Sequence, residues 1–456
     1  MRRALPAAVF LLLAFVLRLP ILHRSVLDWD ESLYFLMAQA WLHGHLPYTT
    51  IWDNKPPGIY AIFALFQSVI PGIEAIRLAA TLCVAVLAWT VSEITARLSG
   101  HMKAGWVSGC LVILCTLSND GLSSNAEPFM SCFVALAVLA VLADAPASLA
   151  GLLLGCGFMV KYVCAPEILV VLALLWSRRR TIGPVLTALL SAAIPLLAVT
   201  ILYGCAGRLA LWWECGISSN FRRAEVPFSA FKLWQALQDQ TLRWGTLYLT
   251  GILVVLRAPT LCSPSWFLPL WMLAALIGAV GAKSFYDHYF IEILPPLCVS
   301  VGIIFAKLPN WPTGRTVFLL IIASLPAYAG WNALSRASGQ DQQIIAAKEL
   351  RDAGASSLYV FDGQPILYAL TGLPPPTYYV LPSELYGTTL AIVAGVDPVQ
   401  EVGRILATRP AYIVRHSWPP DPATTNAKIY AEMDQALAAN YVIWRRLHGL
   451  DIYKLK

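Results

Sequence analysis

The acidic residues that follow the first apolar stretch of the chain are the strongest candidates for chemistry. Asp30 and Glu31 lie in the polar interval 28–31, and Lys55 lies in the sequence DNKPPG over residues 53–58. Ionisable groups close to a bilayer need an aqueous pocket or a charged partner, so their clustering predicts a functional site. A carboxylate can act as a general base on a hydroxyl or amine. A lysine fixed ahead of two prolines can direct its ammonium toward an anionic head group.

Each of these residues also has a simple structural explanation. Acidic residues in the first turn of a helix complement its dipole, which would account for Asp30 and Glu31 at the start of an amphipathic helix along the membrane surface. The pattern for that helix runs over residues 33–42. A lysine near the membrane boundary can extend its ammonium to the interface, which would account for Lys55. The sequence of this segment leaves both explanations open.

Further ionisable residues lie in loops that we expect on the same side of the membrane. Glu127 begins an apolar segment, Lys161 lies in a turn between two others, and His288 lies in a later loop. Two carboxylates on separate loops fit a glycosyl-transfer site in which one acts as base and the other positions the acceptor or donor. The positive charges could neutralise a phosphate leaving group. Alternatively, Lys161 pairs with Glu167 and His288 is an ordinary interfacial histidine.

The composition predicts a polytopic membrane protein. The chain has 456 residues, of which 58% are hydrophobic and only 13% are charged, with a mean hydropathy of +0.64. The net charge of +6 is spread over the loops rather than gathered on a basic face, which argues against binding to nucleic acid. Most of the ten cysteines lie in apolar segments, and no metal-ligand spacing appears. Cys205 and Cys215 could form a disulfide if their loop faces an oxidising compartment.

Hydropathy predicts about eleven transmembrane helices, because roughly 20 apolar residues cross a bilayer. The candidate spans lie near residues 4–22, 75–97, 104–119, 128–143, 149–160, 163–177, 183–203, 245–258, 266–282, 289–306 and 315–332. The apolar segment 57–70 is shorter and is bounded by prolines. We expect it to form a juxtamembrane or re-entrant helix, together with the amphipathic helix before it in the first outer loop.

The distribution of basic residues sets the expected orientation. Arg178, Arg179 and Arg180 form the densest basic run in a short loop, and Arg2 and Arg3 precede the first span. The positive-inside rule places both groups in the cytoplasm when the short segment is not counted as a span. The loops from Asp28 to Lys55, Asn119 to Glu127, Arg208 to Arg243 and Lys283 to His288 then all face the outside.

Ordinary soluble composition begins at about residue 335. We therefore divide the chain into a membrane domain over residues 1–334 and a small extracytoplasmic α/β domain over residues 335–456. Within the second domain, the sequence predicts helices near 342–350 and 399–408, strands near 357–361 and 411–414, and a hairpin over 441–453.

The first outer loop resembles that of the GT-C glycosyltransferases. The resemblance rests on Asp30-Glu31, Tyr34, Ala38, Gly44, Pro47-Tyr48 and the run from Asp53 to Gly58. The most similar branch contains protein O-mannosyltransferases and lipid A aminoarabinose transferases. Later matches are Glu127-Pro128-Phe129, in which Glu stands for the more familiar Asp, Lys161, Asp287-His288-Tyr289 and Leu294-Pro295-Pro296. Together these matches cover roughly residues 25 to 310.

This resemblance implies a role for each matching residue. Asp30 would be the catalytic base, and Glu31 and Glu127 would position acceptor and donor. Lys55, Lys161 and His288 would bind the donor phosphate. In the large outer loop, Trp213, Arg222 and Arg223 are candidates for gating or binding the acceptor, with an interfacial aromatic belt as the alternative.

The resemblance implies an inverting glycosyltransferase that uses a polyprenyl-phosphate sugar donor at the extracytoplasmic face. The acceptor would be an envelope lipid, glycan or protein, and the bacterial inner membrane is the expected location. The sequence identifies no cofactor, and it leaves open whether a divalent cation assists the reaction. A secondary transporter is the alternative function, since it too has about a dozen spans, but transporters place ions near the midplane and often contain inverted repeats. A catalytically silent binding or scaffold subunit is the other alternative.

Overall fold

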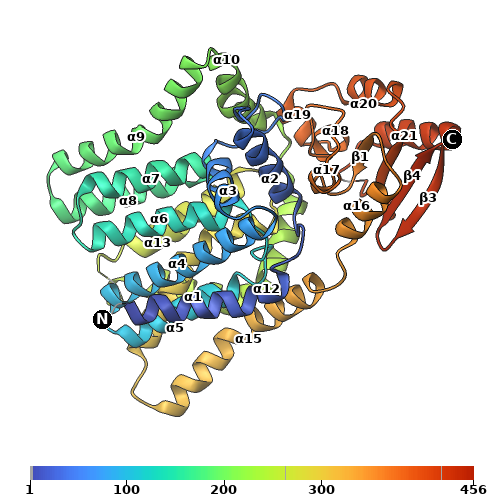
Figure 1. Cartoon of the computed structure of the whole chain (residues 1–456). Helices are drawn as coiled ribbons and strands as arrows, with labels where there is room; N and C mark the ends of the chain where they lie inside the picture. The colour runs from blue at the N-terminus through green and yellow to red at the C-terminus, as the bar shows by residue number, and fades with distance from the viewer. Residues whose placement is uncertain (1–3, 262, 423) are drawn as a thin grey trace.

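A helical bundle carries a small α/β domain at one end (Figure 1). The computed structural model describes residues 4–261, 263–422 and 424–456. Arg2 and Arg3, which contribute to the expected orientation, lie outside the described residues. The architecture confirms a mostly helical chain with several apolar spans and a small C-terminal mixed sheet.

A helix occupies each segment that hydropathy singles out. These helices are α1 (Ala4–Arg18), α4 (Glu74–Ser99), α5 (Met102–Cys115), α6 (Ala126–Leu142), α7 (Ala147–Val160), α8 (Ala165–Arg179), α9 (Ile182–Cys205), α12 (Ala230–Leu261), α13 (Phe267–Gly281), α14 (Leu294–Lys307) and α15 (Pro312–Ala337). By length and composition, five helical stretches of the described chain could cross a membrane: Glu74–Ser99, Ile182–Cys205, Ala230–Leu261, Asp287–Lys307 and Pro312–Asp352. The total of eleven spans stays a prediction.

Helix α12 is longer than the sequence indicates. The predicted span begins at residue 245, but the helix begins at Ala230 and bends where Trp244 and Arg257 leave helical geometry. The first part of α12 contains the polar run 238–243, which hydropathy excludes from a span. This polar part reaches the outer loops, where Gln240 and Arg243 bind Asn119.

Two helices form the first outer loop, α2 (Trp29–Leu42) and the short α3 (Gly58–Val69). The sequence predicts α2 as an amphipathic helix on the membrane surface, but residues 31–38 are all buried. The reason is that α3 packs on one side of α2 and α17 (Ile366–Thr371) of the C-terminal domain packs on another. The helix is therefore enclosed between the two parts of the protein.

The C-terminal domain is built on a four-stranded mixed sheet. The strands are β1 (Leu358–Asp362), β2 (Tyr412–His416), β3 (Tyr441–Leu447) and β4 (Leu450–Leu455), in the order β1-β2-β4-β3. β1 and β2 are parallel, whereas β4 is antiparallel to β2 and β3. Helices α16 (Gln342–Asp352) and α20 (Pro398–Ala407) lie close to their predicted positions. Helices α17, α18 (Ser383–Tyr386), α19 (Leu390–Ala394) and α21 (Ala427–Asn440) were not predicted from the sequence.

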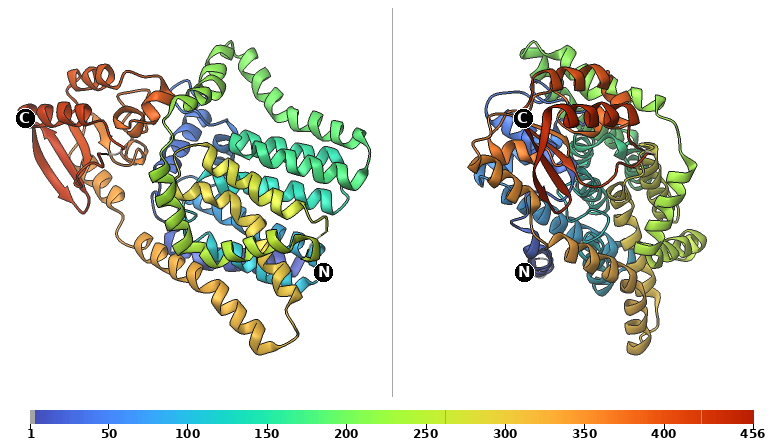
Figure 2. Two further views of the ribbon diagram at one scale, coloured as in Figure 1. Left: turned by 180° about the vertical axis from the view of Figure 1, so that it is seen from behind. Right: turned by 90° about the vertical axis from the view of Figure 1, so that its right-hand side faces the viewer.

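The described N-terminus and the C-terminal domain lie at opposite ends of the bundle, as the two views from the side show (Figure 1 and the left panel of Figure 2). The loops around Asp28, Asn119 and His288 meet at the end that carries the C-terminal domain. Cys205 and Cys215 are both free thiols, so the disulfide considered from the sequence is absent.

A buried carboxylate joins the sheet to the helices of the C-terminal domain. Asp362, at the end of β1, accepts hydrogen bonds from the hydroxyls of Tyr386 (3.1 Å) and Tyr430 (2.8 Å) and lies 3.1 Å from His416 Nδ1. Burial alone would raise the pKa of Asp362, but His416 and the two tyrosines outweigh burial and lower it.

Replacing Asp362 by Asn should therefore destabilise the domain at neutral pH. Hydrogen bonds to a charged group contribute about 1.5–3 kcal/mol each, so we expect a lower melting temperature for the variant at pH 7. Because the folded-state pKa is lowered, the stabilisation is fully present well above the pKa of the unfolded chain, which is about 4, and is lost as the pH falls below that value through the folded-state pKa. Thermal unfolding of wild type and variant at pH 7 and at about pH 3, below the unfolded-chain pKa, measures both effects.

Asp434→Asn is the matched control, because Asp434 is exposed and pairs only at the surface with Arg415. A deficit of Asp362→Asn that is the same at both pH values would contradict the assigned charge.

Candidate active site

A cavity of about 760 Å³ lies between the outer loops of the bundle and the C-terminal domain. It is lined by most of the ionisable residues that the sequence singles out, together with aromatic and polar groups of the C-terminal domain. The charged and aromatic lining residues are Asp28, Trp29, Asp30, Trp52, Asp53, Lys55, Lys161, Tyr162, Arg223, Lys232, Lys283, Tyr286, His288, Tyr289, Glu384 and Tyr386. Cations outnumber acids on this list, which suits an anionic ligand.

Asp30 and Lys55 face each other at the cavity. The Lys55 ammonium lies 3.4 Å from the carboxylate of Asp30 and 3.5 Å from that of Asp53. Tyr34, one helical turn after Asp30, donates its hydroxyl to Asp30 at 3.0 Å. Tyr60 donates to Asp53 at 2.7 Å. The two acids and the lysine therefore form a hydrogen-bonded group with a fixed geometry.

The turn before α3 sets the position of Lys55. The buried Tyr48 donates its hydroxyl to the carbonyl of Lys55. Gly58 lies so close to α7 that a Cβ atom there would be 2.2 Å from the carbonyl oxygen of Met159. Only glycine permits this approach, and it brings the Lys55 turn beside Lys161, two residues after Met159.

A second charged group comes from three other segments. Lys161 donates to Glu127 at the start of α6, and its ammonium lies 3.9 Å from the ring centroid of Tyr289. His288 Nε2 lies 3.9 Å from the same carboxylate. The alternative partner considered from the sequence, Glu167, instead accepts from Trp271 at 2.7 Å.

The charges around Asp30 keep it ionised. Burial alone would raise the pKa of Asp30, but attraction to Lys55, His288 and Lys161 outweighs burial and lowers it to about 2. The pKa of Lys55 is raised, since Asp30 and Asp53 outweigh the effect of its burial. Both side chains are therefore charged at neutral pH.

Glu31 lies outside the cavity, although it is adjacent to Asp30 in sequence. Its carboxylate forms a two-pronged ion pair with Arg77 of α4, at 2.6 and 2.8 Å, and both side chains are almost fully buried. It also accepts from the backbone of Leu27, Asp28 and Ser124. These partners occupy both oxygens of Glu31.

The large outer loop contains α10 (Leu209–Trp212), η3 (Trp213–Ser218), α11 (Ser219–Arg222) and η4 (Arg223–Glu225). Arg223 lines the cavity and donates to Ala282 and Ser284. Arg222 donates to the carbonyl of Val393 in the C-terminal domain. Trp213 is 61% exposed and is not among the lining residues.

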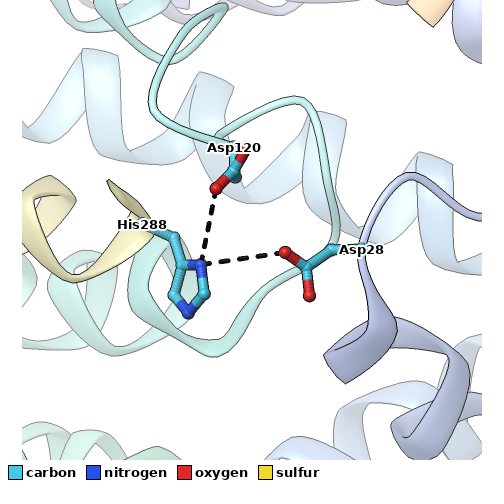
Figure 3. A group of neighbouring side chains, drawn as sticks. All are labelled: Asp28, Asp120 and His288. Atoms are coloured by element: carbon cyan, nitrogen blue, oxygen red, sulfur yellow. Dashed lines mark ion pairs between the residues drawn. The ribbon is translucent and has the colours of Figure 1, made fainter. Parts of the chain in front are cut away.

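Sequence reasoning assigned no role to Asp28, Asp120 or Tyr289, although Asp28 belongs to the acidic cluster of residues 28–31. Asp28 and Asp120 lie near His288, on loops far apart in sequence (Figure 3). An acid two residues before Asp30 was a visible signal for Asp28, but nothing in the sequence connects Asp120 to it. Tyr289 lies in the run Asp287-His288-Tyr289 that carries part of the resemblance, so the sequence did offer a signal for its place in the site beside Lys161.

Residues 54–203 match the family model of dolichyl-phosphate-mannose-protein mannosyltransferases, over roughly a third of the chain. Among solved structures, ArnT from Cupriavidus metallidurans bound to undecaprenyl phosphate aligns with a TM-score of 0.67 and 12% identity, over 98% of this chain and 97% of ArnT. The archaeal oligosaccharyltransferase AglB from Archaeoglobus fulgidus, with an inhibitory peptide and a dolichol-phosphate, aligns with a TM-score of 0.53 and 11% identity, over 91% of this chain and 69% of AglB. Comparison with curated protein sequences gives no significant match.

These matches confirm the resemblance to GT-C glycosyltransferases that the first outer loop indicates. The similarity to ArnT extends over nearly the whole chain, including the C-terminal domain. At 12% identity, this similarity establishes the fold. The family match covers residues 54–203, which include Lys55, Glu127 and Lys161.

Glu31→Gln should destabilise the protein, because it leaves the buried Arg77 guanidinium without its counter-ion. Breaking a buried pair by changing one partner costs about 3–5 kcal/mol, so we expect a large drop in melting temperature and in the yield of folded protein. Thermal unfolding of the purified variants measures this. The double change Glu31→Leu with Arg77→Met should recover part of the loss.

Asp30→Asn is the neighbouring control. Lys55 keeps Asp53 as a partner in this variant, so its melting temperature should stay close to that of wild type. A Glu31→Gln protein with wild-type stability and no transfer activity would instead assign Glu31 to the chemistry.

Proposed function

We propose that this protein is a membrane glycosyltransferase that transfers a sugar from a polyprenyl-phosphate donor to an acceptor hydroxyl or amine. The observation that carries the proposal is the cavity in which Asp30 faces Lys55, beside the group of Lys161, Glu127 and His288. The ArnT fold supports it, because the aligned ArnT structure holds undecaprenyl phosphate and the AglB structure holds a dolichol-phosphate.

Lys55, Lys161 and His288 would bind the donor phosphate. The charge on the phosphate grows when the bond between the sugar carbon and the phosphate oxygen breaks, because that oxygen keeps the electron pair. Cations that are already in place stabilise this charge without reorganisation. Glu127 would hold the Lys161 ammonium in position.

Asp30 would be the general base in the proposed reaction. Its low pKa in the free protein depends on Lys55, Lys161 and His288. An anionic donor that binds these cations would weaken their attraction to Asp30 and thereby raise its pKa. Asp30 would then accept the proton of the acceptor as the new bond to the sugar forms. An attack opposite the departing phosphate inverts the configuration of the sugar carbon.

The C-terminal domain would form the acceptor side of the cavity. Glu384, Tyr386 and Gln364 of this domain line it. Arg222 ties the large outer loop to the same domain and Arg223 lies at the cavity, which supports a role of this loop in admitting the acceptor. A position of the cavity at one end of the bundle fits a transferase better than a transporter, which binds its ions near the midplane.

The proposed location is the bacterial inner membrane, with the cavity and the C-terminal domain on the extracytoplasmic side. The basic run at Arg178 to Arg180 supports this orientation, since it covers the end of α8 and the short connection to α9 and so places positive charge at that end of the two helices. The acceptor would then be a lipid, glycan or protein of the envelope.

Transfer of radiolabelled sugar from synthetic polyprenyl-phosphate donors to membrane extracts tests the proposal. We expect Asp30→Asn to lower the transfer rate by about 10²–10⁴-fold, the range for loss of a general base. Lys55→Ala should weaken donor binding by roughly 10- to 100-fold, as expected for the loss of a charged contact. Both variants should insert and fold.

Lys103→Ala is the matched control for the lysine, because Lys103 is exposed at the start of α5. It should transfer at the wild-type rate. The base assignment fails if Asp30→Asn retains full activity. The enzyme class fails if folded wild type transfers sugar from none of the donors.

A further inference from the structure

The two sides of the cavity differ in charge. The chain before residue 335 supplies every charged side chain that lines the cavity except Glu384. The C-terminal wall of the cavity consists of residues of the segment 381–390 together with Gln364 and Thr424. This segment contains α18 and the start of α19, which lie on the side of the C-terminal domain that faces the bundle (Figure 1). The C-terminal wall is therefore almost uncharged, whereas the opposite side is suited to a phosphate.

Four polar side chains of the C-terminal wall have unused hydrogen-bonding capacity. Glu384 is fully buried, and neither of its carboxyl oxygens has a partner among the described residues. In the same part of the chain, the half-buried hydroxyls of Ser383 and Thr389 form no hydrogen bond either. The oxygen of Gln364 accepts from Ser32 at 3.1 Å, which leaves the N–H groups of its amide for another partner. Buried polar groups are normally paired, so this set indicates a polar ligand.

The C-terminal wall is fixed against the first outer loop. The backbone N–H of Trp52 donates to the carbonyl of Tyr378 at 2.9 Å, and the hydroxyl of Tyr378 donates to the carbonyl of Tyr48. In the segment that follows, the N–H of Glu384 donates to the carbonyl of Leu381 at 2.9 Å. A ligand that meets polar groups already in place loses less conformational entropy when it binds.

We propose that the C-terminal wall binds the hydroxyl groups of a neutral saccharide acceptor, with Ser383, Glu384 and Thr389 as the residues that form hydrogen bonds to it. A sugar hydroxyl both donates and accepts, as do the hydroxyls of Ser and Thr and a protonated carboxyl. A saccharide held there would present a further hydroxyl to Asp30, which lines the same cavity. This inference rests on the proposed function, because it names the class of acceptor for that reaction.

Glu384 suits a hydroxyl better than an amine. Burial raises the pKa of Glu384 well above its ordinary value; Asp53 adds to this effect and Lys55 opposes it. The neutral carboxyl that results donates one hydrogen bond and accepts another, which matches a hydroxyl. An ammonium would also face the excess of cations that line the cavity.

An aromatic face lies beside the polar groups. Trp29 and Tyr386 line the cavity, with ring centroids 6.1 Å apart and an angle of 86° between the rings. Small-molecule sites combine apolar surface of this kind with a few placed polar groups. A sugar ring offers both kinds of surface, since its C–H groups are apolar and its hydroxyls are polar.

Two other classes of acceptor fit this wall less well. A phosphorylated acceptor needs free cations, but the described residues of the C-terminal wall include no lysine or arginine. Arg223 and Lys283, from neighbouring loops, donate to protein oxygens at 2.9–3.1 Å. An extended peptide commonly binds by adding a strand to the edge of a sheet. Among the described residues that line the cavity, none belongs to β1, β2, β3 or β4.

Binding of neutral methyl glycosides to the purified full-length protein tests the wall without any transfer step. Saturation-transfer NMR with a panel of hexose and pentose glycosides should detect binding to wild type. Thr389→Val keeps the shape of the side chain but removes its hydroxyl. It should weaken binding of the tightest glycoside roughly two- to tenfold, the range for one neutral hydrogen bond. Thr389 is half-buried, so this variant should fold.

Thr388→Val is the matched control. Thr388 is the exposed neighbour of Thr389 and does not line the cavity, so its loss of a hydroxyl should leave glycoside binding unchanged. The inference is refuted if wild type binds none of the glycosides, or if the Thr388 and Thr389 variants bind them equally well.

Two substitutions of Glu384 test its charge. Glu384→Gln keeps a donor and an acceptor, so it should bind the glycoside within about twofold of wild type, whereas Glu384→Ala should bind it roughly tenfold more weakly. Equal losses in the two variants would show that an ionised carboxylate is required, which would overturn the neutral acceptor.

Transfer kinetics with polyprenyl-phosphate donors connect the wall to the acceptor. With the tightest saccharide as acceptor, Thr389→Val should raise the KM for that saccharide and leave the KM for the donor unchanged. An effect on the donor KM alone would assign the wall to the transferred sugar and overturn the acceptor role. Transfer to serine-containing peptides or phosphorylated glycolipids, but to no saccharide, would overturn it too. Saccharide binding that Thr389→Val weakens, without transfer from any donor, would support the wall and refute the proposed function instead.

Discussion

The buried ion pair between Glu31 and Arg77 is the constraint on which the cavity depends. It connects the start of α2 to α4, and the same carboxylate accepts the backbone of Ser124 in the second outer loop. Two loops that are about 90 residues apart in sequence are thereby fixed to one point. A buried pair with all its hydrogen bonds made tolerates little displacement, because an unpaired charge in the interior is costly. Because Asp30 is adjacent to Glu31, the ion pair of Glu31 with Arg77 also fixes the position of Asp30.

Ion pairs fix the positions of the charged side chains at the cavity. Asp30 shares Lys55 with Asp53, and Glu127 holds Lys161, so each cation is placed before any ligand arrives. An enzyme gains most from charges that need no rearrangement during the reaction. The C-terminal domain closes the same space with its own side chains, which explains why α2 is enclosed rather than lying on a surface.

Hydropathy and turn chemistry predicted most of the fold. The apolar segments became helices because each must satisfy its backbone internally, and the hairpin formed around Gly449, which has a positive φ of 78°. Reasoning from local pattern was less successful where long-range packing decides. It described α2 as a surface helix, began α12 at residue 245, and considered a disulfide between Cys205 and Cys215. Helix α21, with few strongly apolar positions, was missed.

The sequence by itself determined the apolar helices, the small α/β domain and the presence of a charged first loop, because these follow from composition and from the periodicity of neighbouring residues. Only the tertiary structure decided which charges act together. Glu31 and Asp30 are adjacent in sequence, yet one is enclosed by Arg77 and the other faces the cavity. Asp28, Asp120 and His288 lie on three separate loops and still converge. Local pattern cannot show this, because the distance between loops is set by the packing of the helices that carry them.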